Sequence, residues 1–155
     1  MSTDTDLIKL YSGKILELTT AIPHLTRLEA PMATVKRRSP LCGSAVVVDL
    51  DVADGRVSAF GQDVKACALG QAAAAITGGA IIGRTLCEIT SARDQLRAML
   101  KSEGPTPEAP FDGFEVLSPA KEYRNRHASI LLCIEAAVEA MEQATAGDNT
   151  TEFKQ

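Results

Sequence analysis

The sequence has little of what a nucleic-acid-binding surface needs. It contains no tryptophan, aromatic residues make up 4% of the chain, and the formal net charge is −4. Stacking on bases requires aromatic side chains, and binding to phosphates requires a surplus of basic ones. The basic run at 36–38 is only a local patch. The composition therefore argues against a nucleic-acid-binding protein.

Long apolar runs are also missing. No stretch of about 18 consecutive apolar residues occurs, so no segment is expected to span a membrane. The chain begins with the acidic and polar segment MSTDTDLIKLYSGK. A signal peptide would instead have a basic start and an apolar run. We therefore expect a cytoplasmic protein, in which thiols stay reduced.

Cysteine is sparse, with four residues in a chain of 155. Four are too few for a disulfide scaffold of this length, so we expect them to be buried, reactive or metal-binding. Catalytic motifs are absent as well. The glycines between 78 and 83 lack the Lys-Ser/Thr of a phosphate loop, and no HExxH or paired-carboxylate motif occurs. We therefore expect no enzymatic activity.

What the sequence does contain is a block of strands near its start. Apolar residues recur every three or four positions over 5–20, which predicts a first helix. Residues 33–39 predict an edge strand with basic side chains. Apolar and polar residues alternate over 46–52, and Asp54-Gly55 supplies a tight turn, so we predict a hairpin over 43–61.

A block of helices follows the strands. Small residues from about Cys67 predict a helix that packs closely on another element and is ended by Gly78-Gly79 and Gly83. A capping box formed by Thr85 and Glu88 predicts a helix that runs to about Lys101. A loop rich in proline and glycine precedes a last helix, which we predict over roughly 120–143.

The length and the order of these elements predict one α+β domain over residues 1–155. We expect an N-terminal helix, a three-stranded antiparallel meander, and then helices packed on one face of the sheet. A flexible polar tail is expected at about 144–155.

Two cysteines flank the predicted hairpin. Cys42 lies in a turn before its first strand, and Cys67 lies where its second strand leads into a helix. Antiparallel strands bring these two positions together, and the N-terminus of a helix favours a thiolate at Cys67. Thiolates bind soft metals. From the spacing alone, two buried structural cysteines are an equally good interpretation.

The other candidate residues are His127, Cys87 and Cys133. His127 falls on the inward stripe of the last helix, whereas Ala128 does not. A lone inward histidine is more often a hydrogen-bonded core residue than a ligand. Cys87 and Cys133 are interpreted as packing residues. A thiol enzyme with Cys67 as nucleophile is a weaker hypothesis, because no local signature supports it.

At this point the residues resemble a known family. SPLCGS followed by AVVVDLDVADGRV resembles the turn, strand and DGxV hairpin of NifU/IscU-type iron–sulfur scaffolds. Cys67 matches the cysteine that starts a helix in that family. GRTLCEI resembles a GKTLEE-like helix start, and RHASIL resembles the segment that holds the family's third cysteine. The resemblance covers residues 8–142.

The resemblance implies a scaffold or carrier for a transient [2Fe–2S] cluster, with Zn²⁺ as another occupant of the same ligands. It implies a cysteine desulfurase and apo iron–sulfur proteins as partners, and it leaves a homodimer open. The implied ligands for the metal or cluster are Cys42, Cys67 and His127. The alternative is a degenerate paralogue with a structural zinc site or a purely partner-binding role.

The sequence departs from the family pattern at two positions. Ser44 stands where the family has an aspartate, and the third cysteine is missing. One alignment register sets His127 against that cysteine. Another sets Ala128 there, with His127 against a histidine that can precede it. Both registers remain open from the sequence, although the helix phase favours His127 as the inward group.

Overall fold

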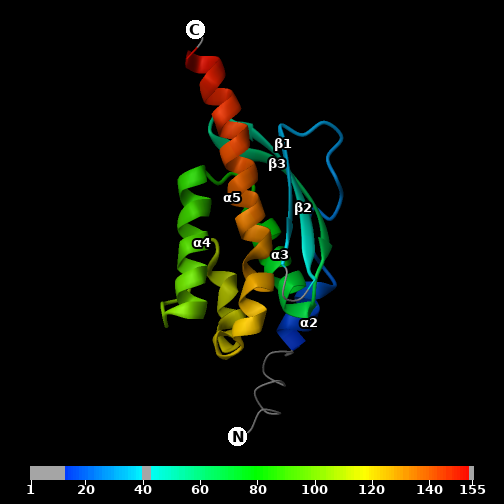
Figure 1. Ribbon diagram of the computed structural model, residues 1–155, viewed down its shortest axis with the longest axis vertical. Coiled ribbons are helices and arrows are strands. Elements are labelled where there is room, and N and C mark those ends of the chain that lie inside the picture. The colour runs from blue at the N-terminus through cyan, green and yellow to red at the C-terminus, as the bar shows by residue number, and fades with distance from the viewer. Residues whose placement is uncertain (1–12, 40–42, 154–155) are drawn as a thin grey trace, which may run out of the picture.

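One antiparallel sheet and a layer of helices on one of its faces make up the structure (Figure 1). The computed structural model describes residues 13–39 and 43–153, with side chains up to 146. The elements are α2 (Gly13–Thr19), β1 (Ala33–Arg38), β2 (Ala45–Ala53), β3 (Arg56–Lys65), α3 (Ala68–Ala80), α4 (Leu86–Lys101), the 3₁₀ helix η1 (Asp112–Glu122) and α5 (Arg124–Phe153). This order confirms the predicted α+β fold.

The hairpin between β2 and β3 forms as predicted. Asp54 and Gly55 both have positive φ, at 55° and 75°, as a two-residue turn of type I′ requires. The strands pair in antiparallel register, with Ala45 opposite Lys65 at the far end from the turn. β1 pairs with the other side of β2 and is an edge strand of the sheet. The hairpin therefore brings the segment before β2 next to the segment after β3.

The core lies between the sheet and α5. Val46, Val48 and Leu50 alternate along β2 and are buried on the face that α5 covers. α5 also packs against α3 and α4. It is buried around most of its circumference over 129–141, as expected for a central helix. Because α5 is central, residues on its different sides contact different neighbouring elements, and this arrangement decides which of its side chains reach the candidate site.

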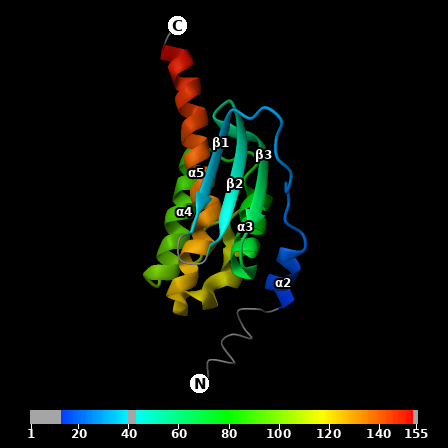
Figure 2. The same cartoon turned by 45° about the vertical axis from the view of Figure 1, so that its right-hand side comes forward.

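The opposite face of the sheet is partly covered by the segment between α2 and β1. Figure 2 shows this segment running beside the sheet for most of its length. Arg27 binds the buried Asp49 carboxylate with two hydrogen bonds of 2.6 and 3.1 Å. Leu28 N–H and the Thr34 hydroxyl donate to the same carboxylate. These donors compensate the Asp49 carboxylate for the loss of water on burial. The same hydrogen bonds hold the segment against the sheet.

Several helix boundaries differ from the predictions. α3 ends at Ala80, between the glycines predicted to end it, but the loop after α4 contains η1, which was not predicted. α5 reaches Phe153, so the predicted end at 143 was wrong. No proline follows Pro119, so nothing in the sequence interrupts the helical hydrogen-bond ladder. The flexibility of the tail stays a prediction, and the part of the first helix before residue 13 lies outside the described residues.

Across the described residues, no helix has the length and apolar content needed to cross a membrane.

Candidate metal-binding site

Cys67 lies at the N-cap of α3, immediately after β3 ends. The residue is half-buried and not in a disulfide. Its side chain forms no capping hydrogen bond with the helix, although the N–H groups of the first turn lie close enough to stabilise its thiolate. The predicted position at a helix N-terminus is confirmed.

One serine hydroxyl lies beside this sulfur, and a second serine hydroxyl lies beside the first. Ser129 Oγ, on α5, is 3.4 Å from Cys67 Sγ and 3.1 Å from Ser44 Oγ. Both serines are buried, with exposed fractions of 1% and 3%. The site therefore joins three segments: the residue before β2, the start of α3 and the first turns of α5. We call Ser44, Cys67 and Ser129 the sulfur site.

The packing of α3 against α5 makes room for the sulfur site. Gly70 lies one turn into α3, directly against Ser129. A Cβ at residue 70 would be 2.5 Å from Ser129 Oγ and 2.8 Å from Ala66 Cβ. No real side chain fits there, so glycine allows the two helices to approach closely. The predicted close packing of this small-residue helix is confirmed at this position.

The pKa of the Cys67 thiol is lowered from its ordinary value. Partial burial raises the pKa, but four stabilising influences on the thiolate outweigh it: the Ser129 hydroxyl, the N–H groups of Gly70 and Leu69, and the charge of Arg126. When Cys67 is a thiolate, Ser129 must be the donor in their hydrogen bond, because a thiolate only accepts. The site thus favours the form of cysteine that binds metals and attacks sulfur.

The predicted ligand Cys42 lies outside the described residues. The residues on either side of it are described. Gly43 N–H donates to Ser39 O at 3.0 Å, and Ser39 N–H donates to Ser44 O at 2.7 Å. These bonds join the described residues on either side of 40–42, and Ser44 is the residue whose hydroxyl contacts Ser129. The approach of Cys42 to Cys67 stays a prediction.

His127 is buried, as the helix phase predicted, with 2% of its surface exposed, whereas Ala128 is only half-buried. Its Nε2 lies 3.1 Å from the Ala120 carbonyl oxygen at the end of η1. Two residues along a helix turn the side-chain direction by about 200°. Because Ser129 points to Cys67, His127 points to another side of α5. The structure does not bring His127 and Cys67 together, and its role as a ligand stays a prediction.

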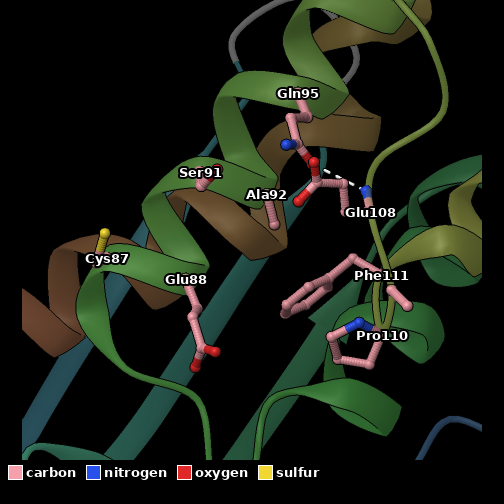
Figure 3. Close-up of a pocket in the computed structure, with 9 residues that line it drawn as sticks. Cys87, Glu88, Ser91, Ala92, Gln95, Glu108, Pro110 and Phe111 are labelled. Carbon is pink, nitrogen blue, oxygen red and sulfur yellow. Dashed lines mark hydrogen bonds between the residues drawn. The ribbon is translucent and has the colours of Figure 1, made fainter.

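The other two cysteines differ from each other. Cys133 is buried on α5 and donates to Gln62 Oε1 at 3.1 Å, and burial raises its pKa to about 12. The packing interpretation is confirmed for Cys133. It was wrong for Cys87, which is exposed. Ile89, two positions on, faces the core, so Cys87 is turned to the outer side of α4, where it is one of the residues that line a surface pocket (Figure 3).

The described part of the chain contains no group of three His, Cys, Asp or Glu side chains that could hold a metal. The side chain that contacts the Cys67 sulfur carries a hydroxyl group instead, that of Ser129. Ser129 and Gly70 were missed in the sequence analysis. Ser129 could have been noticed as a polar residue at the start of an apolar run, and Gly70 as the only glycine in the first turns of a helix rich in alanine.

The fold and the sulfur site together define a small α+β domain with a reactive cysteine where its hairpin meets a helix. Comparison with solved structures identifies the family to which this domain belongs. A nitrogen-fixing NifU-like protein (N-terminal) from Brucella abortus is 38% identical, with a TM-score of 0.88 over 91% of this chain and 98% of that one. The chain therefore belongs to the NifU-like family, as the sequence resemblance predicted.

More distant structures share the fold. One is a protein from Fervidobacterium islandicum assigned as an iron–sulfur cluster assembly scaffold for the SUF system. It is 18% identical, with a TM-score of 0.77 over 86% of this chain and 98% of that one. Another, of unassigned function, is 18% identical with a TM-score of 0.75 over 87% and 98% of the two chains. No protein-family model matches the chain, and no curated protein matches it either.

Proposed function

We propose that this chain is an assembly scaffold or carrier for an iron–sulfur cluster, with Cys42 and Cys67 as its ligands. The cluster is the cargo of the protein, bound for a time and then passed on. Membership of the NifU-like family and a scaffold among the structures that share the fold support this role. The sulfur site is the observation that carries it.

The proposal follows from the chemistry of Cys67. A thiolate is the protein ligand that iron–sulfur clusters use most often. Cys67 has a lowered pKa and lies at the N-terminus of α3. The start of β2 lies opposite the end of β3, so the segment that contains Cys42 begins at the same end of the sheet. Two thiolates at this end would give a cluster half of its usual four ligands.

The other groups near the sulfur site are not thiolates, so this chain differs from a site in which four thiolates hold the cluster. Ser44 and Ser129 offer neutral hydroxyls, which bind iron and zinc poorly compared with a thiolate or a carboxylate. His127 would have to release the Ala120 carbonyl and turn toward the sulfur site to act as a ligand. We therefore propose that a partner, a second copy or a small thiol completes the coordination. A labile cluster suits a protein that hands its cargo on.

The partners follow from this role. A cysteine desulfurase would supply sulfur, and apo iron–sulfur proteins would accept the cluster. The chemistry of both steps requires an exposed approach to the thiolates. Cys67 is only half-buried, which is consistent with such an approach.

Anaerobic reconstitution tests the proposal. The purified chain is incubated with Fe²⁺, cysteine, a catalytic amount of cysteine desulfurase and dithiothreitol, which reduces the persulfide sulfur to sulfide. Iron and acid-labile sulfide are then counted per chain. Mössbauer spectra identify the cluster type. We expect iron and sulfide in equal amounts, and loss of both in Cys42→Ala and in Cys67→Ala.

Cys87→Ala is the matched control, because Cys87 is an exposed cysteine on a different helix. It should load as the parent does. Equal iron and sulfide in all four proteins would contradict the proposal, since binding would not depend on the sulfur site.

A second candidate is a paralogue that has lost cluster assembly and either keeps a structural zinc ion or only binds partners. The neutral hydroxyls beside Cys67 favour this candidate, because they make the donor set poor. Zinc bound in place of iron, with unfolding shifted to lower temperature by a chelator, would support the structural zinc ion. A chain that takes up neither metal would leave only the partner-binding role.

A further inference from the structure

A shallow hollow of about 110 Å³ lies on the outer face of the sheet, the face turned away from α5. The pairing register explains how it forms. Ala45 lies opposite both Arg38 and Lys65, and a second row of three residues follows on the same face. Each strand thus contributes two of the lining residues, which are Lys36, Arg38, Ala45, Val47, Asp63 and Lys65. We call these six residues the basic hollow.

The middle strand forms the floor of the basic hollow. Ala45 and Val47 are short, half-buried side chains of β2. The lining residues on β1 and β3 are longer and exposed, so they form a rim on each side of this apolar floor. Sites for small molecules usually have volumes of about 300 Å³ or more. The basic hollow is therefore suited to a side chain of another protein rather than to a cofactor.

The three cations of the basic hollow have no ion-pair partner within the described part of the chain, whereas most of the other described Arg and Lys side chains pair with a carboxylate. Arg37, between the two cations of β1, pairs with Glu135 and Glu139 on α5. Three cations and the carboxylate of Asp63 leave a net charge of +2 here, in a chain with a net charge of −4. An acid placed among these cations would relieve their repulsion.

The edge position of β1 and β3 does not account for this arrangement by itself. Basic residues on an edge strand discourage pairing with another sheet wherever along the strand they lie. On the outer face, however, the two ends of the sheet differ. Toward the hairpin turn, Arg27 binds Asp49, and the Thr26 carbonyl oxygen leaves no room for a Cβ at Gly61. The unpaired cations gather at the other end, where the rim residues are exposed.

The basic hollow lies at the same end of the sheet as the sulfur site. Ala45 directly follows Ser44, and Lys65 comes two residues before Cys67. Two residues of chain span at most about 7 Å. A protein that acts on the Cys67 sulfur would therefore be close enough to contact the basic hollow at the same time.

We propose that the basic hollow docks an acidic segment of the protein that donates sulfur to Cys67. A Glu or Asp side chain of that segment lies over Ala45 and Val47, with its carboxylate between the cations of the two rims. The identity of the partner rests on the proposed function, whereas the acidic character of its segment follows from the basic hollow. Complementary charges of this kind mainly increase the rate of association and make it sensitive to salt.

Binding to a cysteine desulfurase tests this inference on the chain without metal. The desulfurase is immobilised, and association and dissociation rates are measured at pH 7.5 and ionic strengths of about 0.05 and 0.3 M. Lys36→Glu, Arg38→Glu and Lys65→Glu should each weaken binding by about three- to tenfold at the lower ionic strength, mainly through slower association. The differences from the parent should shrink at the higher ionic strength, because salt screens exposed charges.

Lys101→Glu is the matched control, because it changes the net charge by the same amount. Lys101 is exposed and has no ion-pair partner among the residues that the structure describes. It is the last residue of α4, which lies across α5 from the sheet (Figure 1). This variant should change the affinity by less than about twofold. Circular dichroism checks that all four variants are folded.

Cys67→Ala separates this inference from the proposed function, and it should bind the desulfurase as the parent does. If the parent binds through the basic hollow but Cys67 takes up no sulfur, the inference stands and the proposed function fails. If the parent assembles a cluster while the three hollow variants bind the desulfurase as tightly as the parent, the inference is wrong and the proposed function stands. No binding of the parent to the desulfurase would also overturn the inference.

Two other occupants would be recognised by the same variants. A second copy of the chain would show as self-association in sedimentation, and a nucleic acid as binding of a single-stranded oligonucleotide. Loss of either interaction in the three hollow variants, with desulfurase binding unchanged, would assign the basic hollow to that occupant and overturn the proposal.

Discussion

Gly70 and Ser129 are in direct contact across the interface between α3 and α5, and no Cβ fits between them. The contact places the Ser129 hydroxyl against the sulfur of Cys67. The width of this helix interface therefore decides whether the sulfur site is assembled.

The first prediction concerns this contact. Gly70→Ala puts a methyl group 2.5 Å from Ser129 Oγ and should lower the free energy of unfolding by about 1–3 kcal/mol through overpacking. It should also weaken the contact between Ser129 and Cys67. Gly79→Ala is the control, because residue 79 is in the same helix with open space around it. It should be neutral or stabilise by up to about 1 kcal/mol, since alanine is the better helix former. Equal effects of the two substitutions in chemical denaturation would contradict the prediction.

The second prediction concerns the thiolate. Ser129→Ala removes a hydrogen bond that favours the charged form of Cys67, so the pKa of Cys67 should rise. The alkylation rate of Cys67 by iodoacetamide, followed by peptide mass spectrometry, should then reach its midpoint at a higher pH than in the parent. Cys133 is an internal control: it is buried, its pKa is raised to about 12, and it should stay unmodified in the folded chain. A midpoint that does not move would show that the hydroxyl does not stabilise the thiolate.

The third prediction concerns the buried carboxylate of Asp49. Its hydrogen bonds outweigh the effect of burial and lower its pKa. A group with a lowered pKa stabilises the fold above its unfolded pKa, about 3.9 for Asp, and this stabilisation is lost as the pH falls through the folded value. Asp49→Asn should therefore cost about 1.5–3 kcal/mol at pH 7, and the difference from the parent should shrink in acid.

Asp51→Asn serves as the control for Asp49. Asp51 lies on the same strand and accepts a single hydrogen bond, from Met32 N–H at 2.8 Å. Urea unfolding at pH 7 and at pH 3 measures both variants. A loss at Asp49 that is no larger than at Asp51, or that is the same at both pH values, would be inconsistent with the role given to this carboxylate.

Much of the fold could be predicted because local signals agreed with the tertiary structure. The alternation along β2, the Asp54-Gly55 turn and the capping box at Thr85 and Glu88 each act within a few residues, and all three formed. Family membership could be predicted as well, because the motif around the hairpin is continuous in the sequence. The contact between Arg27 and Asp49, which holds the segment between α2 and β1 against the sheet, could not be predicted. The two residues are far apart in the sequence, and no local pattern relates them.

The direction of His127 could not be predicted for a different reason. The periodicity of a helix separates buried positions from exposed ones only when the helix has a single buried face. α5 is surrounded by the sheet, α3, α4 and η1, so several directions are inward. His127 and Ser129 are both buried and yet reach different neighbours, Ala120 and Cys67. The phase identified the burial of His127 correctly but did not identify what it faces.

The last prediction concerns Ser44, which is buried and in contact with Ser129 beside the sulfur. Ser44→Asp adds a carboxylate at the position where related scaffolds are expected to have one. A carboxylate gives both charge and an oxygen donor to Zn²⁺, so the affinity for Zn²⁺ should rise by at least about tenfold, or about 1.4 kcal/mol. Ser44→Asn is the control, because it has nearly the shape of aspartate and no charge.

Competitive titration with a zinc chelator at pH 7.5 measures the affinities of the parent and both variants, and circular dichroism checks that each is folded. Without metal, the new carboxylate should raise the pKa of Cys67, because two negative charges would lie close together. A bound cation removes this penalty, so the gain in affinity requires the carboxylate and the thiolate to face the same ion. If Ser44→Asp binds Zn²⁺ no more tightly than Ser44→Asn while both remain folded, residue 44 does not reach the metal. The hydroxyls of the sulfur site would then serve the Cys67 thiolate alone.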